Sequence, residues 1–68
     1  MDKTELSDRE REVLVWISKG KSTQDIAAIL EISVATVSFH YRSVASKFGT
    51  TNRTQTVVEA IRRGLIEA

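Results

Sequence analysis

The sequence predicts an all-α fold of four short helices packed into one small domain. Apolar residues recur at spacings of three and four in each candidate element, and this period belongs to helices and not to strands. A serine or an asparagine precedes each of these segments, in a position suited to an N-cap. With 68 residues, the chain has room for one domain with a thin core. Its stability must therefore depend on good capping and tight packing.

The first helix is expected over about residues 8–19. Ser7 and Glu10 have the spacing of a capping box, in which each side chain accepts a hydrogen bond from the backbone amide of the other residue. Gly20 can end the helix in a left-handed turn. The apolar side consists of Val13, Leu14, Trp16 and Ile17. Trp16 is interpreted as a packing residue and not a binding residue, because burial is what large aromatic side chains most often supply.

The start of the chain carries no structural pattern. Residues 1–5 show no periodicity and are interpreted as a disordered start or the stub of a linker, which leaves residues 6–68 as the single domain. No apolar run is long enough for a transmembrane helix, and Met1 leads into charged residues instead of a signal sequence. The lack of cysteine agrees with a reducing compartment. The sequence therefore predicts a soluble, cytoplasmic protein without a membrane partner.

Two further helices are expected over about residues 23–30 and 34–48. Ser22 with Asp25 repeats the serine-to-acid capping pattern before the first of them, and Ser33 can cap the second. The connection between these helices is too short for any other element. They are therefore predicted to be close neighbours in space.

The turn between these two helices has the features of a helix-turn-helix. Ala27 lies ten positions before Val37, so a small residue stands where the second helix must cross closely. Glu31 occupies a turn position where a glycine is often found, and its longer side chain must point outward. The arrangement resembles the helix-turn-helix, whose second helix enters the major groove of DNA.

The helix over residues 34–48 has two distinct faces. The apolar stripe, which is expected to be buried, consists of Val34, Val37, Tyr41, Val44 and Phe48. The far face carries Ala35, Ser38, Phe39, Arg42 and Ser46. No carboxylate occurs between Ile32 and Val58, whereas ordinary solvated helices carry Glu and Lys pairs. The missing negative charge indicates that the partner of this surface is itself negative.

A fourth helix is expected over about residues 53–63. Asn52 with Gln55 forms a further cap signature before it. Gly49 can end the third helix and Gly64 the fourth. The expected inward face consists of Val57, Val58, Ile61 and Leu65.

Charge and composition exclude several classes of protein. The net charge is only +1, but residues 1–31 carry a balance of −2 and residues 32–68 a balance of +3. The chain has no cysteine and a single histidine, His40, so no disulfide, thiolate metal site or catalytic set of nucleophile, acid and base can be assembled. The sequence therefore predicts a protein that is not an enzyme and has no metal or other cofactor.

Taken together, these segments resemble the LuxR-type (GerE-like) helix-turn-helix domain of bacterial transcription regulators. The resemblance extends from Leu6 to Ile66 and is carried, in this order, by LSDREREVL, GKSTQDIAAIL and ISVATVSFHYRSVASKFGTTNRTQTVVEAIRRGLI. The segment from Val37 to Gln55 is nearest to the quorum-sensing branch. The resemblance implies sequence-specific binding of double-stranded DNA by a transcription regulator, with the third helix in the major groove.

The resemblance places base contacts just after Val37, on Ser38 and Phe39, and one turn later on Arg42. A guanidinium can donate two hydrogen bonds to guanine O6 and N7, which makes Arg42 the preferred residue for direct readout. Ser38 can donate or accept and is less selective. Phe39 departs from the small aliphatic residue that is common at this position, although the quorum-sensing branch shows it. Its ring either contacts a thymine methyl or folds back across the helix.

Backbone contacts are expected at the helix starts. From the residues alone, Lys21, Ser22 and Thr23 suit a phosphate oxygen, because a helix N-terminus exposes unpaired amides and a partial positive charge. The alternative is that Ser22 only caps and Lys21 is only solvated. The resemblance places backbone contacts on Lys21, Thr23, Thr36, Lys47, Asn52 and Arg53. Such contacts set the register of the protein on DNA and carry little sequence information.

Members of the family bind as dimers through the fourth helix, on roughly palindromic sites whose half-sites lie about 10 bp apart. Here the candidate dimer contact consists of Thr56, Ala60, Arg63 and Gly64, three of which form a ridge of small residues along which another helix could approach. The alternative explains Gly64 by capping and Ala60 by packing. The resemblance thus predicts a weak homodimer, with RNA polymerase as a further candidate partner.

Two rival functions remain open. A protein-interaction module with the helix-turn-helix shape but no DNA binding is favoured by the apolar area of Phe39 and the low net charge, and is opposed by the carboxylate-free stretch. A sigma-factor-like promoter reader shares the helix-turn-helix but does not predict a helix that starts after Asn52.

Overall fold

The computed structural model describes residues 6–67, and the interpretation of residues 1–5 as a linker concerns residues outside this range. The described part contains four helices and no strand: α1 (Asp8–Ser18), α2 (Thr23–Leu30), α3 (Val34–Phe48) and α4 (Arg53–Arg62). Each helix begins at the predicted residue and ends at or within one residue of the predicted end. The all-α helix-turn-helix fold is therefore confirmed.

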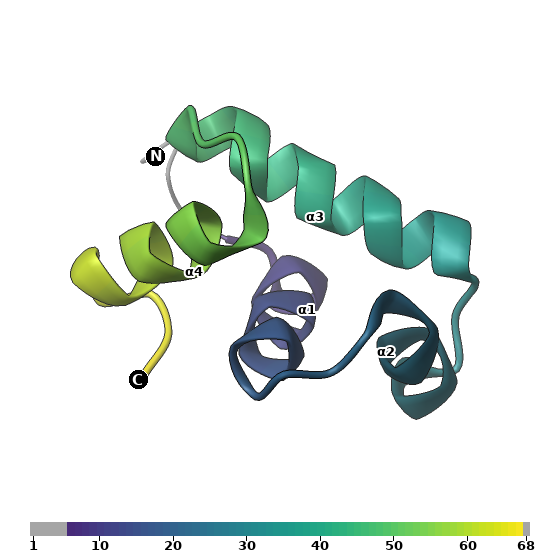
Figure 1. Ribbon diagram of the computed structural model, residues 1–68. Coiled ribbons are helices and arrows are strands. Elements are labelled where there is room, and N and C mark those ends of the chain that lie inside the picture. The colour runs from purple at the N-terminus through teal and green to yellow at the C-terminus, as the bar shows by residue number, and fades with distance from the viewer. Residues whose placement is uncertain (1–5, 68) are drawn as a thin grey trace.

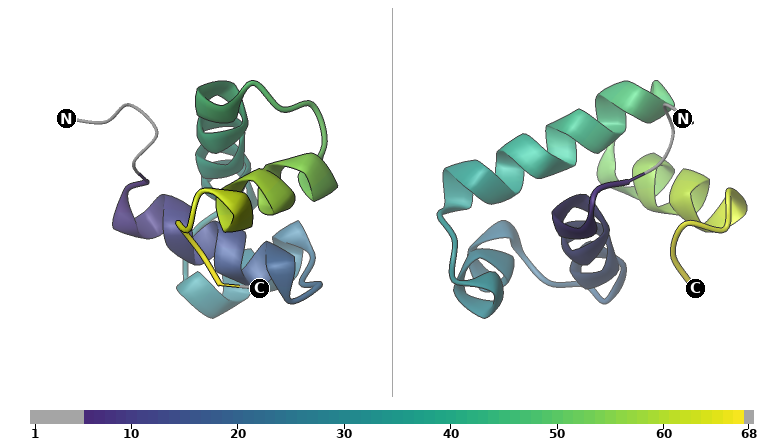
Figure 2. Two further views of the ribbon diagram at one scale, coloured as in Figure 1. Left: turned by 90° about the vertical axis from the view of Figure 1, so that its left-hand side faces the viewer. Right: turned by 180° about the vertical axis from the view of Figure 1, so that it is seen from behind.

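The longest helix, α3, runs along one side of the molecule, and the other three helices lie together on its opposite side (Figure 1). The view from behind shows the same arrangement (Figure 2). One long side of α3 therefore stays free of other helices. Helices α1 and α3 each contact all three of the other helices.

Side-chain caps start all four helices as the sequence indicates. Ser7 Oγ accepts from the amide of Glu10 at 3.1 Å, and Glu10 Oε1 accepts from the amide of Ser7 at 2.9 Å, which completes a capping box. Ser22 forms the same reciprocal box at the start of α2, Ser33 Oγ caps α3 and Asn52 Oδ1 caps α4. Each such cap contributes on the order of 1 kcal/mol, a sizeable part of the stability of so small a domain.

Two residues with positive φ end the helices of the helix-turn-helix. Gly49 ends α3 with φ 69°, as the sequence predicts. Glu31 ends α2 with φ 57°, in the left-handed region that a residue with a Cβ atom rarely adopts. The side chain of Glu31 is exposed, in agreement with the outward direction expected for it.

The core consists of two clusters on either side of α1. One contains Leu6, Leu14, Val44, Ala60 and Ile66, and the other contains Val13, Ile26, Ala27 and Val37. Val13 and Leu14 are both fully buried, so consecutive residues of α1 serve different clusters. Trp16 packs against the second cluster, which confirms its expected role as a packing residue. Helix α1 thus joins the helix-turn-helix to α4.

Two residues expected on buried faces are exposed. Val34 is 43% exposed because, as the first residue of α3, it lies just past the turn from α2. Val58 is 57% exposed, whereas Thr56 and Ala60 are fully buried. The inward face of α4 is therefore rotated from the predicted one and centres on small residues, because small side chains let α4 approach α1 and α3 closely. Among the described residues, no helix is long and apolar enough to span a membrane.

Candidate nucleic-acid interface

The uncovered side of α3 presents the residues that the helical period places opposite the core. Ala35, Phe39, Arg42 and Ser46 are all exposed and recur at spacings of four and three. Ser38, also expected there, is half-buried at the edge of this face. Figure 2 shows that no other helix covers this side of α3. Because α3 contains no carboxylate, the face presents no negative side chain of its own.

The ring of Phe39 extends into solvent from this face. It is 61% exposed and makes a T-shaped contact with the His40 ring, with 5.6 Å between centroids and an interplanar angle of 69°. Phe39 therefore does not fold into the core. The exposed ring of Phe39 therefore forms an apolar surface beside Arg42.

Most of the expected backbone-contact residues gather where α2 and α4 begin. Lys21, Ser22 and Arg53 line one groove of about 480 Å³, with Thr54, Val57 and Val58 among its other lining residues. The hydroxyl of Thr23 accepts a hydrogen bond from Nη2 of Arg53, a residue 30 positions later. Asn52, next to Arg53, forms the N-cap of α4. The N-termini of α2 and α4 thus lie close together, and the cationic residues Lys21 and Arg53 line the same groove.

The other two expected backbone contacts lie elsewhere on α3 and already have partners. The hydroxyl of Thr36 shares a hydrogen bond of 2.8 Å with Ser33 at the start of the helix. Near the other end, Nζ of Lys47 lies 2.7 Å from Oε1 of Glu10. The predicted set therefore divides into one group at the groove and two separate residues on α3.

Glu10 is a buried carboxylate that the sequence pattern assigned only to a helix cap. It is 5% exposed, and besides the Ser7 amide it accepts hydrogen bonds from Ser43 Oγ and Lys47 Nζ, each at 2.7 Å. Burial by itself raises the pKa of the Glu10 carboxyl. The hydrogen bonds from Lys47, Ser7 and Ser43, together with the charge of Lys47, outweigh burial and lower this pKa to about 2. Glu10 therefore stays ionised and holds α3 against α1.

A signal for this role was present in the sequence. Glu10 lies three, four and seven residues before Val13, Leu14 and Ile17, which places it on the apolar face of α1. A carboxylate on a buried face requires polar partners. Its partners, Ser43 and Lys47, lie more than 30 positions away and could not be chosen by spacing alone.

Two of the four candidate dimer residues are buried inside the domain and cannot contact a second copy. Thr56 is fully buried, and its hydroxyl bonds to that of Thr50 at 2.6 Å; Ala60 is fully buried in the first core cluster. The expected ridge of small residues is therefore an internal packing face, which corrects the prediction for these two residues. The close approach of α4 to the core explains both small side chains.

Arg63 and Gly64 remain at the surface of the domain near the end of α4. The guanidinium of Arg63 lies 4.5 Å from the centroid of the Phe48 ring and donates to Glu59 at 2.6 Å. Gly64 is exposed, with φ 74°. Hydrogen bonds from Arg62 and Arg63, together with the charges of these two residues, lower the pKa of Glu59 to about 2. The most exposed large apolar residue of α4 is Val58.

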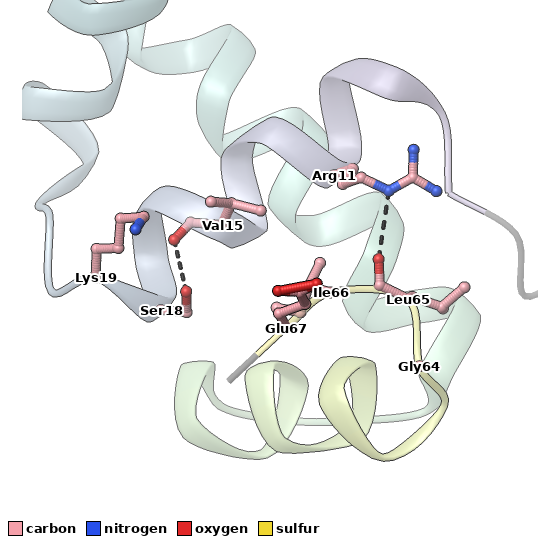
Figure 3. A pocket seen from close by; sticks show the side chains of 8 residues that line it. All are labelled: Arg11, Val15, Ser18, Lys19, Gly64, Leu65, Ile66 and Glu67. Carbon is pink, nitrogen blue, oxygen red and sulfur yellow. Dashed lines mark hydrogen bonds between the residues drawn. The ribbon is translucent and has the colours of Figure 1, made fainter.

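A second cavity, of about 590 Å³, lies between α1 and the C-terminal residues (Figure 3). Arg11 crosses one end of it and donates from Nε to the backbone oxygen of Leu65 at 3.3 Å. None of the residues expected to touch bases or phosphates lines this cavity. Among residues 6–67, no group of three or more His, Cys, Asp or Glu side chains is placed to hold a metal ion.

The sequence matches the family described as bacterial regulatory proteins, luxR family, over residues 4–60. The putative HTH-type transcriptional regulator y4qH of Sinorhizobium fredii is 47% identical over 62 residues, which are 91% of this chain and 19% of y4qH. The HTH-type quorum-sensing regulator RhlR of Pseudomonas aeruginosa is 48% identical over 61 residues, which are 90% of this chain and 25% of RhlR. The chain therefore spans a quarter or less of the length of these curated relatives.

A solved structure of the transcription factor GerE has a TM-score of 0.85 to this chain at 37% identity, and the match covers 88% of this chain and 90% of that one. The likeness to GerE therefore includes the whole arrangement of four helices.

A helix-turn-helix whose second helix exposes a long face without carboxylates defines a DNA-binding domain of the kind found in transcription regulators. The chain belongs to the luxR family of bacterial regulatory proteins. Among its relatives are quorum-sensing regulators.

Proposed function

We propose that the domain binds a specific sequence of double-stranded DNA in the bacterial cytoplasm, with α3 lying in the major groove. The observation that carries this proposal is the exposed, carboxylate-free face of α3, on which Phe39 and Arg42 extend into solvent. A major groove admits one α-helix and is flanked by phosphates, so a face without carboxylates avoids charge repulsion there. The family match supports the same function.

Arg42 reads a guanine in this proposal, through two hydrogen bonds from its guanidinium to O6 and N7. Phe39, one turn away and 61% exposed, supplies apolar contact to a thymine methyl. Ser38 lies at the edge of the face and donates or accepts a single hydrogen bond.

Phosphate contacts flank the DNA major groove in this proposal. Lys21, Ser22, Thr23, Asn52 and Arg53 form one group where two helix N-termini meet, and such termini favour phosphate. Thr36 and Lys47 contact phosphates from α3 itself.

Dimerisation on a palindromic site is the second part of the proposal. Val58 offers the apolar contact, since it is 57% exposed on α4, and Arg63 and Gly64 lie near the end of the same helix. A two-fold axis beside α4 would place the α3 helices of the two domains on half-sites about 10 bp apart. Helix α3 is therefore called the recognition helix. RNA polymerase, bound beside such a dimer, is the proposed protein partner.

A module that binds only proteins is the alternative function. Four large apolar residues, Ile29, Val34, Phe39 and Val58, are exposed and could serve such a partner. They lie on three different helices, however, and only Phe39 lies on the carboxylate-free face of α3. DNA binding explains that face, whereas a protein partner does not.

Selection from a pool of random duplexes tests the proposal. The chain is incubated with the pool at low and moderate salt, retained DNA is sequenced, and the experiment is repeated with Arg42→Ala. We expect a two-fold symmetric motif, and we expect the variant to lose a guanine preference at one position in each half-site. Salt dependence separates the two functions, because phosphate contacts release counterions and an apolar protein interface does not. No retention at low salt would favour the protein-interaction module.

A further inference from the structure

Three helices meet at the side chain of Arg53. Arg53 is the first residue of α4, and its Nη2 donates a hydrogen bond to the hydroxyl of Thr23, the first residue of α2. The central carbon of its guanidinium lies 5.6 Å from the centroid of the Tyr41 ring, at the middle of α3. This distance is within the range of a cation–π contact. The side chain is therefore held from two directions by residues of two other helices.

These contacts leave much of the guanidinium available. The contact with the Tyr41 ring uses no hydrogen-bond donor of the guanidinium. Thr23 uses one of five N–H donors. Arg53 is exposed, so the remaining donors can reach an oxygen outside the domain. A guanidinium held in this way suits the paired oxygens of a phosphate.

The groove that Arg53 lines contains a second cationic residue. Arg53 and Lys21 line the same groove, together with Ser22, the N-cap of α2. A free arginine side chain samples many rotamers and loses that freedom when it binds. If Arg53 is already ordered beside Lys21 in the unbound domain, less entropy is lost when a phosphate enters.

We propose that Tyr41 and Thr23 are positioning residues for DNA binding, which hold the guanidinium of Arg53 beside Lys21 in the orientation that a backbone phosphate requires. The inference rests on the proposed DNA-binding function. It gives Thr23 a role through Arg53, and it gives a role in binding to Tyr41, whose place on the apolar stripe indicated packing only. Because Tyr41 belongs to α3, the same contact also links the phosphate-binding guanidinium of Arg53 to the recognition helix.

A double-mutant cycle on DNA affinity tests the proposal. Dissociation constants are measured for a duplex retained by the unmodified domain, using Tyr41→Leu, Arg53→Ala and the double variant, each at several salt concentrations. We expect Tyr41→Leu to weaken binding about two- to fivefold, because the pre-ordering that Tyr41 supplies can be worth no more than the exposed cation–π contact that produces it. The same substitution should have no effect when Arg53 is already alanine. Arg53→Ala should reduce the slope of log K against log salt by about one.

Conservative variants provide the matched controls. Tyr41→Phe keeps the aromatic face and should bind like the unmodified domain. Thr23→Ser keeps the hydroxyl, whereas Thr23→Val removes it at the same size, so only Thr23→Val should weaken binding. The salt slope is the readout that a purely structural role would not change. Thermal unfolding, followed by Trp16 fluorescence, shows the temperature below which every variant is folded.

Three outcomes would contradict the proposal in distinguishable ways. An equal loss from Tyr41→Leu with and without Arg53 would mean that Tyr41 does not act through Arg53. Tighter binding by Tyr41→Leu would mean that the ring competes with phosphate for the guanidinium. If the unmodified domain bound no duplex even at low salt, the proposed function itself would fail, and the positioning role with it.

Discussion

Glu10 on α1 and Lys47 on α3 form an ion pair with 2.7 Å between Oε1 and Nζ, and the carboxylate is 5% exposed. The same carboxylate caps α1 through the Ser7 amide and accepts a hydrogen bond from Ser43. One side chain therefore starts α1 and fixes the second half of the recognition helix against it. Both oxygens of the Glu10 carboxylate accept hydrogen bonds, so this charged group can be buried in a domain with a small core.

Removal of this charge should destabilise the domain. We expect Glu10→Gln to lower the free energy of unfolding by about 2 kcal/mol, because a buried charged acceptor is replaced by a neutral amide, whose NH2 group cannot accept from Ser7, Ser43 or Lys47. Urea unfolding, followed by Trp16 fluorescence, measures the change. Glu12→Gln is the matched control, since Glu12 lies on the same helix with its side chain half exposed in a surface pair with Arg9. Equal effects of the two substitutions would contradict the assigned role of Glu10.

The same carboxyl should make stability depend on acid pH. The pKa of Glu10 is about 2 in the folded domain and about 4.3 in an unfolded chain, so the unfolded state binds the proton more tightly. Its stabilising contribution is therefore fully present above about pH 4.5 and is lost as the pH falls towards 2. Unfolding free energies measured from pH 7 to pH 2 should converge for the unmodified domain and Glu10→Gln. The pKa of Glu59 is also lowered to about 2, but Glu59 titrates in both proteins. Its contribution therefore cancels when the unfolding free energy of Glu10→Gln is subtracted from that of the unmodified domain. Curves that stay parallel would contradict the assignment.

Replacing the residue with positive φ at the turn by glycine should stabilise the domain. Glu31 has φ 57°, a conformation that favours glycine. We expect Glu31→Gly to raise the free energy of unfolding by about 0.5–1 kcal/mol, whereas Glu31→Ala, which keeps the Cβ atom, should give no such gain. Thermal unfolding measures both variants. A similar gain from alanine would show that the charge, and not the backbone, sets the effect.

Phe39 and Lys21 should affect DNA binding in different ways. Phe39→Ala removes apolar contact to a base and should weaken binding to the selected site without changing the salt slope. Lys21→Ala removes a phosphate contact, so it should weaken binding to all duplexes and reduce the slope by about one. Fluorescence anisotropy at several salt concentrations measures both quantities. A salt slope changed by Phe39→Ala would contradict a base contact.

Val58 should matter most when two domains bind together. We expect Val58→Ser to weaken binding to a duplex with two half-sites about tenfold, because each protomer loses part of a buried valine side chain at the α4 contact. Binding to a single half-site should fall less, because there Val58 only lines the groove shared with Lys21 and Arg53, and this duplex is the internal control. Val58→Ile, which keeps the apolar surface, should bind both duplexes normally. Equal losses on both duplexes would place Val58 in contact with DNA or the core.

Sequence patterns predict the local part of this structure well. The helix starts follow from Ser7, Ser22, Ser33 and Asn52, since each cap joins residues within one turn of the chain. The free face of α3 follows from the helical period for the same reason, and Phe39 and Arg42 lie on it as expected. The residues proposed to read bases are thus on the surface that the period assigns to them.

Contacts between helices could not be predicted in the same way. Spacing suggested that Thr56 and Ala60 formed a surface ridge, but both are fully buried, because the distance at which α4 packs on α1 and α3 decides which of its faces is internal. Val58 was expected inside and lies outside for the same reason. A helical period gives the relative positions of side chains around an axis, but not the rotation of that axis against its neighbours.

By itself, the sequence determined four helices, their caps and the free face of α3, because these depend on hydrogen bonds and periods that span three or four residues. Only the tertiary structure decided that Glu10 binds Lys47, 37 positions away, and that Arg53 meets both Thr23 and Tyr41. Such pairs depend on the distances and angles at which whole helices pack. Those follow from the shape of the complete core and not from any one stretch of chain.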